Sequence, residues 1–287
     1  VCRLVRQGLD DGAYPSACLS VGIRGSVCVR QTFGPARETT LYDIASLSKI
    51  VGTTMIAFRF LEEGQLRLYD TVEQFFPAPE DKKGITVLQL MTHTSGLPAH
   101  FYLSEEADGP GDAVRAILAH PLEHAPGALP VYSCMGYILL GRILEQIGGQ
   151  SIDRLAQEYV FEPLGLTHTT YRPAGDVAPT ERDPATGELL RGAVHDENAR
   201  FLGGLSGDMT RFVQMLALGG KLPDGTQFLS PATLRAALVN RTPGAGHEFR
   251  GLGFNLAGSP SNFLGDLMSP RAYGHTGFTG TSIAVDP

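Results

Sequence analysis

The middle of the chain is dominated by apolar residues at helical spacing. The longest such pattern runs from Ser46 to Glu63 and stops at Gly64, a residue type that commonly ends helices. Its apolar side chains share one helix face: Leu47, Ile50, Val51, Met55, Phe58 and Leu61. Similar patterns predict further helices over 1–12, 87–92, 112–120, 135–147, 152–160 and 209–218.

Strand patterns lie near both ends of the chain. Residues 17–31 alternate in the strand sense around a turn at Arg24-Gly25, and shorter strand patterns follow over 251–256, 272–276 and 281–285. This order predicts an α/β (α+β) fold in which an antiparallel sheet, built from both chain ends, is flanked by helices. We expect 1–45 and 206–287 to form the sheet domain and 46–205 to form a mostly helical inserted domain.

Composition excludes several classes of protein. The 287 residues are 43% hydrophobic and 18% charged, so the chain can bury a core and is not disordered as a whole. The formal net charge is -7 and no run of Lys and Arg stands out, which argues against a nucleic-acid or anionic membrane surface as partner. No apolar run approaches the ~18 residues that span a bilayer.

The four cysteines are expected to be unpaired. A two-residue turn at Arg24-Gly25 would pair Val21 with Cys28 and Cys18 with Gln31, which places the two sulfurs on opposite faces of the hairpin. Unpaired thiols and the lack of an apolar leader at the N-terminus slightly favour the cytoplasm. The sequence starts without Met, so the compartment stays open.

Three segments carry side chains suited to nucleophilic catalysis. In Ser46-Leu47-Ser48-Lys49 the hydroxyl and the amine share one helix face, so a neutral lysine can take the serine proton. Tyr132 follows a proline-rich loop and precedes a helix. Gly274-His275-Thr276-Gly277 resembles a strand edge that a substrate can approach closely. The first and third segments, each taken alone, also fit a purely structural role: a capped helix with a surface lysine, or a glycine-rich hairpin.

Together and in this order, the segments resemble the serine β-lactamase and penicillin-binding protein superfamily. The resemblance is to its class C β-lactamase-like branch, which includes esterases and D-alanyl-D-alanine carboxypeptidases. It spans nearly the whole chain and extends to residues 90–97, 132–137, 161–166 and 194–199.

The resemblance implies a role for each matching residue. Ser46 would be the acylated nucleophile, and Lys49 and Tyr132 would share the proton transfers, in an order that is disputed across the superfamily. The backbone N–H groups of Ser46 and Phe278 would form the oxyanion hole. Substrate would bind beside Cys134, His275, Thr276 and Gly277. The active site would then lie in the cleft between the two domains.

Two departures from the family pattern bear on the substrate. Cys134 stands where relatives usually have Asn, and a thiol is a weak hydrogen-bonding group. His275 stands where efficient β-lactamases have Lys, and a histidine is mostly neutral at pH 7. Both changes favour hydrolysis of less anionic ester or amide substrates, with β-lactam hydrolysis slow or absent. The resemblance therefore implies a serine hydrolase that works through an acyl-enzyme on a small-molecule substrate, as a carboxylesterase, a D-alanyl or other D-amino-acid peptidase, or a weak β-lactamase.

Other chemistries find little support in the sequence. There is no H-E-x-x-H, C-x-x-C, Walker or G-x-G-x-x-G pattern, so no metal and no cofactor is expected. His93 is interpreted as a structural residue that hydrogen-bonds a loop. The alternative to a serine hydrolase is a non-catalytic, penicillin-binding or scaffold member of the same fold. The oligomeric state is not predicted.

Overall fold

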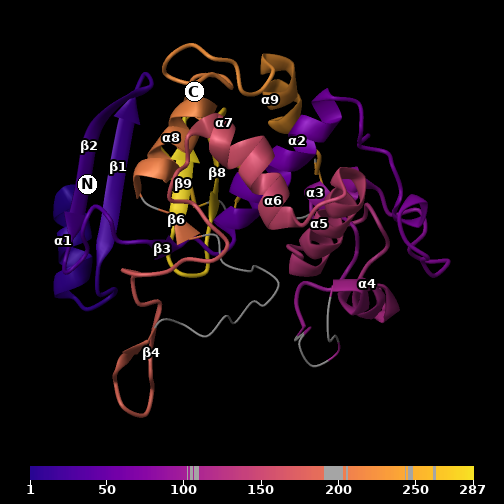
Figure 1. Ribbon diagram of the computed structural model, residues 1–287, viewed down its shortest axis with the longest axis horizontal. Coiled ribbons are helices and arrows are strands. Elements are labelled where there is room, and N and C mark those ends of the chain that lie inside the picture. Colours follow the sequence, from indigo (N-terminus) through magenta and orange to yellow (C-terminus); the bar gives the residue numbers. More distant parts are fainter. Residues whose placement is uncertain are drawn as a thin grey trace.

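The N-terminal hairpin and the C-terminal strands gather on one side of the molecule, and the helices of the chain's middle gather on the other (Figure 1). The computed structural model describes residues 1–101, 103, 106, 110–190, 203–204, 206–242, 244, 248–260 and 263–287. Mixed helices and antiparallel strands confirm the predicted fold class. Within the described ranges, every helix is too short or too polar to reach across a lipid bilayer.

The strands form small antiparallel sheets. At the N-terminus, helix α1 (Cys2–Asp10) precedes the hairpin of β1 (Ala17–Ile23) and β2 (Ser26–Phe33). At the C-terminus, β8 (Tyr273–Thr276) pairs with β7 (Asn255–Leu256) on one side and β9 (Ser282–Val285) on the other. Two shorter pairs complete the set: β3 (Tyr42–Asp43) with β6 (Gly203–Gly204), and β4 (Glu181–Arg182) with β5 (Leu189–Leu190).

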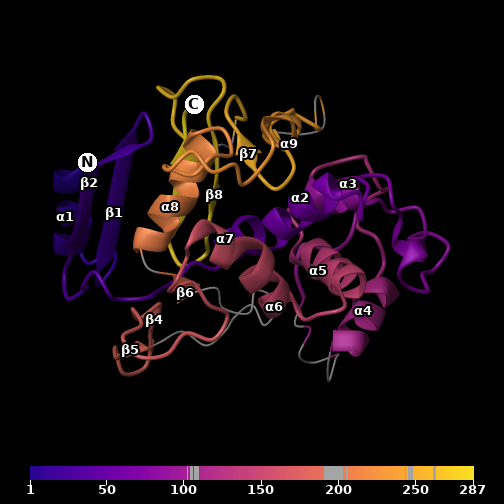
Figure 2. The same ribbon diagram turned by 45° about the horizontal axis from the view of Figure 1, so that its top comes forward.

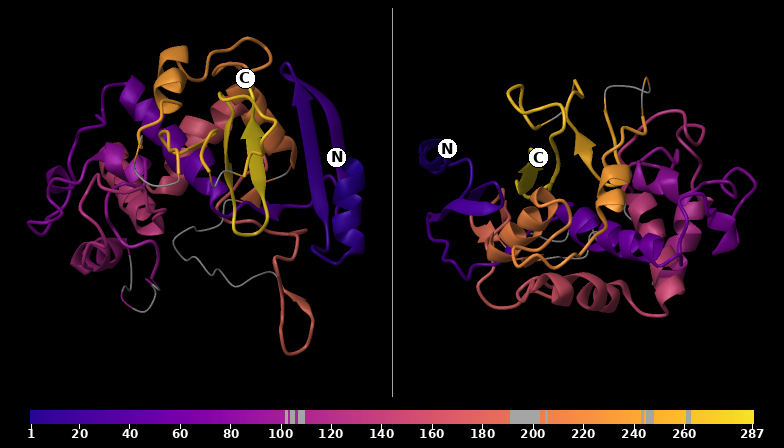
Figure 3. Two further views of the ribbon diagram at one scale, coloured as in Figure 1. Left: turned by 180° about the vertical axis from the view of Figure 1, so that it is seen from behind. Right: turned by 90° about the horizontal axis from the view of Figure 1, so that it is seen from above.

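The chain ends contribute neighbouring sheets and not the single sheet that was predicted. Among the described residues, the β1–β2 ladder stays separate from the β7–β8–β9 ladder. The hairpin nevertheless lies beside β9 when the molecule is seen from behind (Figure 3). Helix α8 (Ser206–Ala217) packs against both β1 and β9 and so joins the two sheets. Alternating apolar residues identify a strand, but they do not say which edge it pairs with.

The register of the N-terminal hairpin corrects one prediction. Ile23 pairs with Ser26, as a two-residue turn requires, but a bulge between Val21 and Gly22 then shifts the ladder. Val21 therefore faces Val29, and Cys18 faces Thr32, so the predicted partners Cys28 and Gln31 are wrong by one residue. A bulge adds one residue to one strand, which period-two alternation cannot reveal. Cys18 and Cys28 both carry free thiols.

The helices agree with the sequence patterns over most of their length. The predicted helix over 46–63 divides into a π-helical segment, η1 (Lys49–Thr54), and α2 (Met55–Glu62). The other helices of the chain's middle extend from the centre to the right of Figure 2. They are α3 (Val87–Met91), α4 (Pro110–Ala119), α5 (Cys134–Gly148), α6 (Ile152–Ala156), η4 (Gln157–Phe161) and α7 (Glu162–Leu164). The 3₁₀ turn η2 (Val72–Gln74) and α9 (Pro231–Ala237) were not predicted.

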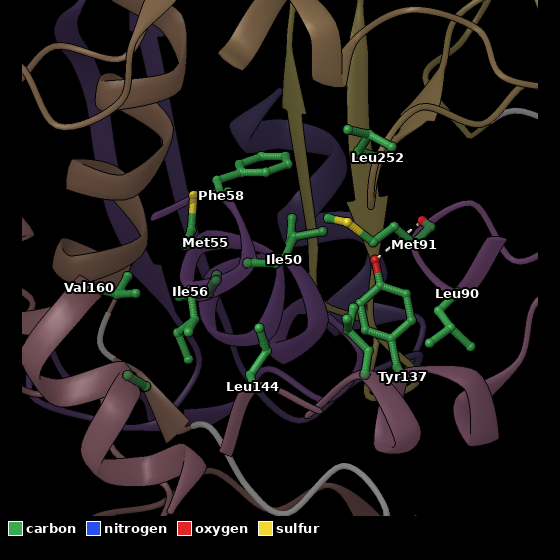
Figure 4. Close-up of a cluster of buried hydrophobic side chains, with 14 of the residues drawn as sticks. Ile50, Met55, Ile56, Phe58, Leu90, Met91, Tyr137, Leu144, Val160 and Leu252 are labelled. Carbon is green, nitrogen blue, oxygen red and sulfur yellow. Dashed lines mark hydrogen bonds between the residues drawn. The ribbon is translucent and has the colours of Figure 1, made fainter. Parts of the chain in front are cut away.

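The core surrounds η1 and α2, which run through the centre of the molecule. Ile50, Met55 and Phe58 lie among side chains from α3, α5 and η4 (Figure 4). Two polar groups inside this core are paired: the Tyr137 hydroxyl lies 3.4 Å from the Met91 carbonyl oxygen and 3.2 Å from Thr54 Oγ1. Because burial fixes η1 and α2 on all sides, it also fixes the turn that begins them at Ser46.

Candidate active site

Ser46 lies in a turn immediately before the buried central helix. The preceding residue, Ala45, adopts a left-handed backbone with φ 44°, which is uncommon for a side chain with a Cβ. The Asp43 side chain accepts a 2.8 Å hydrogen bond from the Ala45 N–H and so stabilises this turn. Lys49 Nζ donates to Ser46 Oγ at 3.1 Å, and Lys49 is only 5% exposed. The S-x-x-K spacing therefore brings the hydroxyl and the amine together as predicted.

Tyr132 is held at the start of α5 by its neighbours. Val131 N–H donates to the His93 carbonyl at 2.8 Å, and Cys134 N–H donates to the Ala99 carbonyl at 2.9 Å. Ser133 caps α5: its hydroxyl accepts from Gly136 N–H at 3.0 Å and donates to the Pro98 carbonyl. These bonds fix the backbone on both sides of Tyr132.

Tyr132 meets the Lys49 amine with its ring and not with its hydroxyl. Lys49 Nζ lies 5.2 Å from the ring centroid. The hydroxyl oxygen is buried and has no hydrogen-bond partner among the described residues. The three side chains are thus gathered, but the phenol does not bond Ser46 or Lys49 in this state. Catalytic hydrogen bonds often form only once substrate is bound.

The turn between β8 and β9 is pinned to the backbone that precedes Ser46. Thr279 Oγ1 donates to the Asp43 carbonyl at 2.6 Å, and Thr281 Oγ1 donates to the Ile44 carbonyl at 3.1 Å. Gly277 packs so closely that an added Cβ would lie 2.6 Å from the Ile44 carbonyl oxygen. Phe278 follows directly, and its side chain is 83% exposed. The sequence-predicted residues 275–278 therefore lie beside Ser46.

Two buried imidazoles flank Tyr132, and neither carries a charge at neutral pH. Burial, with the nearby charges of Lys49 and Arg250, lowers the pKa of His275 to about 3. His275 Nδ1 donates to the Thr276 carbonyl at 2.7 Å, which leaves Nε2 as an acceptor. Burial likewise lowers the pKa of His93. His93 Nδ1 accepts from Ser133 N–H at 3.0 Å, which confirms its predicted structural role.

Arg250 is the charged residue of the site that the sequence did not reveal. It is 4% exposed, and its Cζ lies 5.5 Å from the Tyr132 ring centroid. Its Nε donates to Glu248 Oε2 at 2.9 Å, and Nη2 donates to the same oxygen. Arg250 stands alone before Gly251 with no pattern around it, so only the fold brings it to Tyr132. The one available signal was a lone arginine in an apolar, glycine-rich stretch.

The remaining predicted positions are less informative. Cys134 is the first residue of α5 and is half-buried, two positions after Tyr132. Residues 161–166 form the end of η4, α7 and the turn at Gly165. Residues 194–199 lie outside the described residues. The described part of the chain contains no group of three or more His, Cys, Asp and Glu side chains placed to hold a metal ion.

Comparison with known proteins supports the resemblance seen in the motifs. The family model Beta-lactamase matches residues 1–287. An Escherichia coli protein named "Putative D-alanyl-D-alanine carboxypeptidase" is 30% identical over 344 aligned positions, covering 99% of this chain and 78% of that protein. An octameric penicillin-binding protein homologue from Pyrococcus abyssi shares 23% identity and superposes with a TM-score of 0.78, covering 99% of this chain and 70% of that one. EstCE1, a hydrolase with promiscuous acyltransferase activity, shares 21% identity with a TM-score of 0.79, covering 99% and 89%.

Proposed function

The chain belongs to the β-lactamase family and is a hydrolase of the β-lactamase and penicillin-binding protein fold, and we propose that it works through a covalent acyl-enzyme formed on Ser46. The observation that carries this proposal is the 3.1 Å hydrogen bond between the amine of the buried Lys49 and the hydroxyl of Ser46, which is itself half-buried. A serine hydroxyl becomes a useful nucleophile when a base lies within hydrogen-bond reach.

The proposed reaction assigns one step to each group. Lys49, in its neutral form, takes the Ser46 proton as Oγ attacks the carbonyl carbon of the substrate. The backbone N–H groups of Ser46 and Phe278 stabilise the resulting oxyanion, and each such donor contributes about 3 kcal/mol in comparable sites. The Tyr132 hydroxyl then gives its proton to the leaving group. Water enters and attacks the acyl carbon while the Tyr132 oxygen takes a proton from that water, and Lys49 returns its proton to Ser46 Oγ as the bond between Oγ and the acyl carbon breaks.

The site is proposed to lie between the sheet domain (1–45 and 206–287) and the helical domain (46–205). One contact between the two domains supports this division: Tyr132, from the helical part, has its ring centroid 5.9 Å from that of His275 on β8. Within the sheet domain, the bond from Thr279 to the Asp43 carbonyl holds the β8–β9 turn next to the point where the helical domain begins at Ser46. A substrate bound beside His275, Thr276 and Gly277 would therefore meet groups from both domains.

The substrate is proposed to be an ester or amide without a strong requirement for a carboxylate. The neutral His275 offers no cation at the β8 edge, and Arg250 is buried and bound to Glu248, so neither presents a charge to solvent. The names of related proteins, a carboxypeptidase and a hydrolase with acyltransferase activity, fit acyl transfer to water. A β-lactam, whose carboxylate favours a cationic partner, should react slowly.

Two measurements test the proposal. Intact mass spectrometry after treatment with a fluorophosphonate should show one adduct on Ser46, and Ser46→Ala should show neither adduct nor hydrolysis while unfolding at the same temperature. A folded wild-type protein without an adduct would favour the non-catalytic scaffold instead. Turnover of a p-nitrophenyl ester should exceed that of a chromogenic cephalosporin, and the reverse order would refute the proposed substrate preference.

A further inference from the structure

Tyr132 is surrounded by buried polar atoms whose hydrogen-bonding capacity is unused. In the described part of the chain, four such side-chain atoms lack a partner: His93 Nε2, Tyr132 Oη, Arg250 Nη1 and His275 Nε2. All four belong to one cluster, because the His93, His275 and Arg250 side chains each lie within 6 Å of the Tyr132 ring centroid. A buried polar group without a partner is costly, so this concentration calls for a functional explanation.

The cluster carries positive charge from two sources. Six titratable side chains face Tyr132 or its charged neighbours: Lys49 from η1, His93 from the loop after α3, Tyr137 from α5, His275 from β8, and Glu248 with Arg250 from the segment before β7. Both imidazoles are neutral. Lys49 can lose its proton, whereas an arginine side chain stays protonated in proteins.

Glu248 holds Arg250 in place without cancelling its effect at Tyr132. The Glu248 carboxylate accepts hydrogen bonds from Nε and Nη2 of the guanidinium. The Glu248 side chain is 38% exposed, so water screens part of its charge. The Nη1 side of the guanidinium is left unpaired and buried. The guanidinium is therefore anchored along its Nε and Nη2 edge, with its Cζ 5.5 Å from the centroid of the Tyr132 ring.

We propose that Arg250 is a positioning residue of the hydrolytic site: its permanent charge, held by Glu248 against the Tyr132 ring, favours the neutral form of Lys49, whose amine lies against the same ring. The neutral amine beside Ser46 can accept the serine proton. A like charge nearby disfavours the charged form of a buried amine, typically by about one pH unit. The comparison is between Lys49 with and without this neighbouring cation. The inference rests on the proposed function.

The test is the acidic limb of the pH profile of kcat/KM for a p-nitrophenyl ester. Activity falls where Lys49 gains its proton and can no longer accept one from Ser46, so the midpoint of this limb reports the neutral form of Lys49. In Arg250→Met that midpoint should rise by about one pH unit. In Arg250→Lys it should return towards the wild-type value. In Glu248→Gln, which removes a negative charge beside Arg250, the midpoint should move down.

The midpoint is expected to move in opposite directions in Arg250→Met and Glu248→Gln, and this distinguishes an effect of charge from an effect of packing. A residue that merely fills space would lower the plateau in both Arg250→Met and Glu248→Gln and leave the midpoint unmoved, which would overturn the inference. Arg235→Met, which removes an exposed cation on α9, is the charge-matched control and should leave the profile unchanged. If Arg250→Met fails to fold, Glu248→Gln still decides the question, since a midpoint that stays or rises in Glu248→Gln refutes the inference.

Labelling of Ser46 by the fluorophosphonate is measured in the same variants. If the wild-type protein forms no adduct, the proposed function itself is refuted. An adduct in the wild type, with superimposable acidic limbs in all variants, would remove only the role of Arg250.

Discussion

Replacing Gly277 with alanine tests whether the β8–β9 turn is held against the backbone that precedes Ser46. An alanine Cβ would lie 2.6 Å from the Ile44 carbonyl oxygen, and it would also overlap Thr281 Oγ1. The first is a backbone atom and cannot swing aside as a long side chain can. Gly277 has an ordinary backbone conformation for any residue, so the whole effect comes from these contacts.

The magnitude follows from what must move. Forcing a methyl group into a packed contact typically costs about 1–3 kcal/mol. Displacing Thr281 also breaks its hydrogen bond to the Ile44 carbonyl, worth about 1 kcal/mol. We therefore expect Gly277→Ala to lower the free energy of unfolding by about 2–4 kcal/mol. The shift would also displace the Phe278 N–H, the second donor of the proposed oxyanion hole, and loss of one such donor lowers kcat by about 10²–10³.

The assay is urea unfolding together with hydrolysis of a p-nitrophenyl ester. Gly141→Ala is the matched control, because a Cβ at this helical position meets nothing within 4 Å. Adding Thr281→Ala to Gly277→Ala removes one overlap but leaves the Ile44 carbonyl in the way, so rescue should be partial. Wild-type stability and turnover in Gly277→Ala would refute the reasoning, as would complete rescue by Thr281→Ala.

Two further outcomes follow from buried groups of the site. Lys49→Met should lower kcat/KM by about 10²–10⁴ without reducing stability, since a thioether chain replaces a buried amine. The control is Lys82→Met, which removes a buried lysine paired with Asp81 and should keep its activity. Equal losses in both variants would contradict the role of Lys49 as the base. The free energy of unfolding should fall as pH drops below about 6.5, by up to ~1.4 kcal/mol per unit for each imidazole. The unfolded chain protonates His275 there, whereas the folded chain, with its pKa lowered to about 3 by burial, does not. Urea unfolding of His275→Gln at several pH values should give a shallower slope than the wild type, and parallel slopes would contradict this account.

Long periodic helices could be predicted from the sequence, whereas short elements and register could not. The helix predicted over 135–147 is α5 (Cys134–Gly148), ended by Gly149 with φ 65°. Helix α9 was missed although Ser230 and Pro231 form a typical start, because its seven residues hold too few turns for a period to show. The bulge at Val21 was missed because it changes the pairing between strands without changing their composition.

In the candidate site, too, local features could be predicted from the sequence and contacts made by the fold could not. The Ser46–Lys49 bond depends only on three-residue spacing at a helix start, so the sequence predicted it. The approach of His275 and Gly277 was expected from the family resemblance. Arg250 depends on the path of the chain from α9 to β7, which no local pattern encodes. Its charge alone suggests a surface residue, and only burial against Tyr132 shows otherwise.

The π-helical turn of η1 sets the angular phase between the proposed nucleophile and the core. Lys49 begins this segment and Thr54 ends it, where α2 takes over with its side chains locked among their neighbours. A π-helix closes its hydrogen bonds between residues five apart, whereas an α-helix closes them between residues four apart, so each residue of η1 advances by less than the 100° of an α-helix. If the same six residues were α-helical and α2 kept its place in the core, Ser46 and Lys49 would be rotated about the helix axis and would turn away from Tyr132. The wider turn of η1 thus sets the direction in which the proposed nucleophile faces.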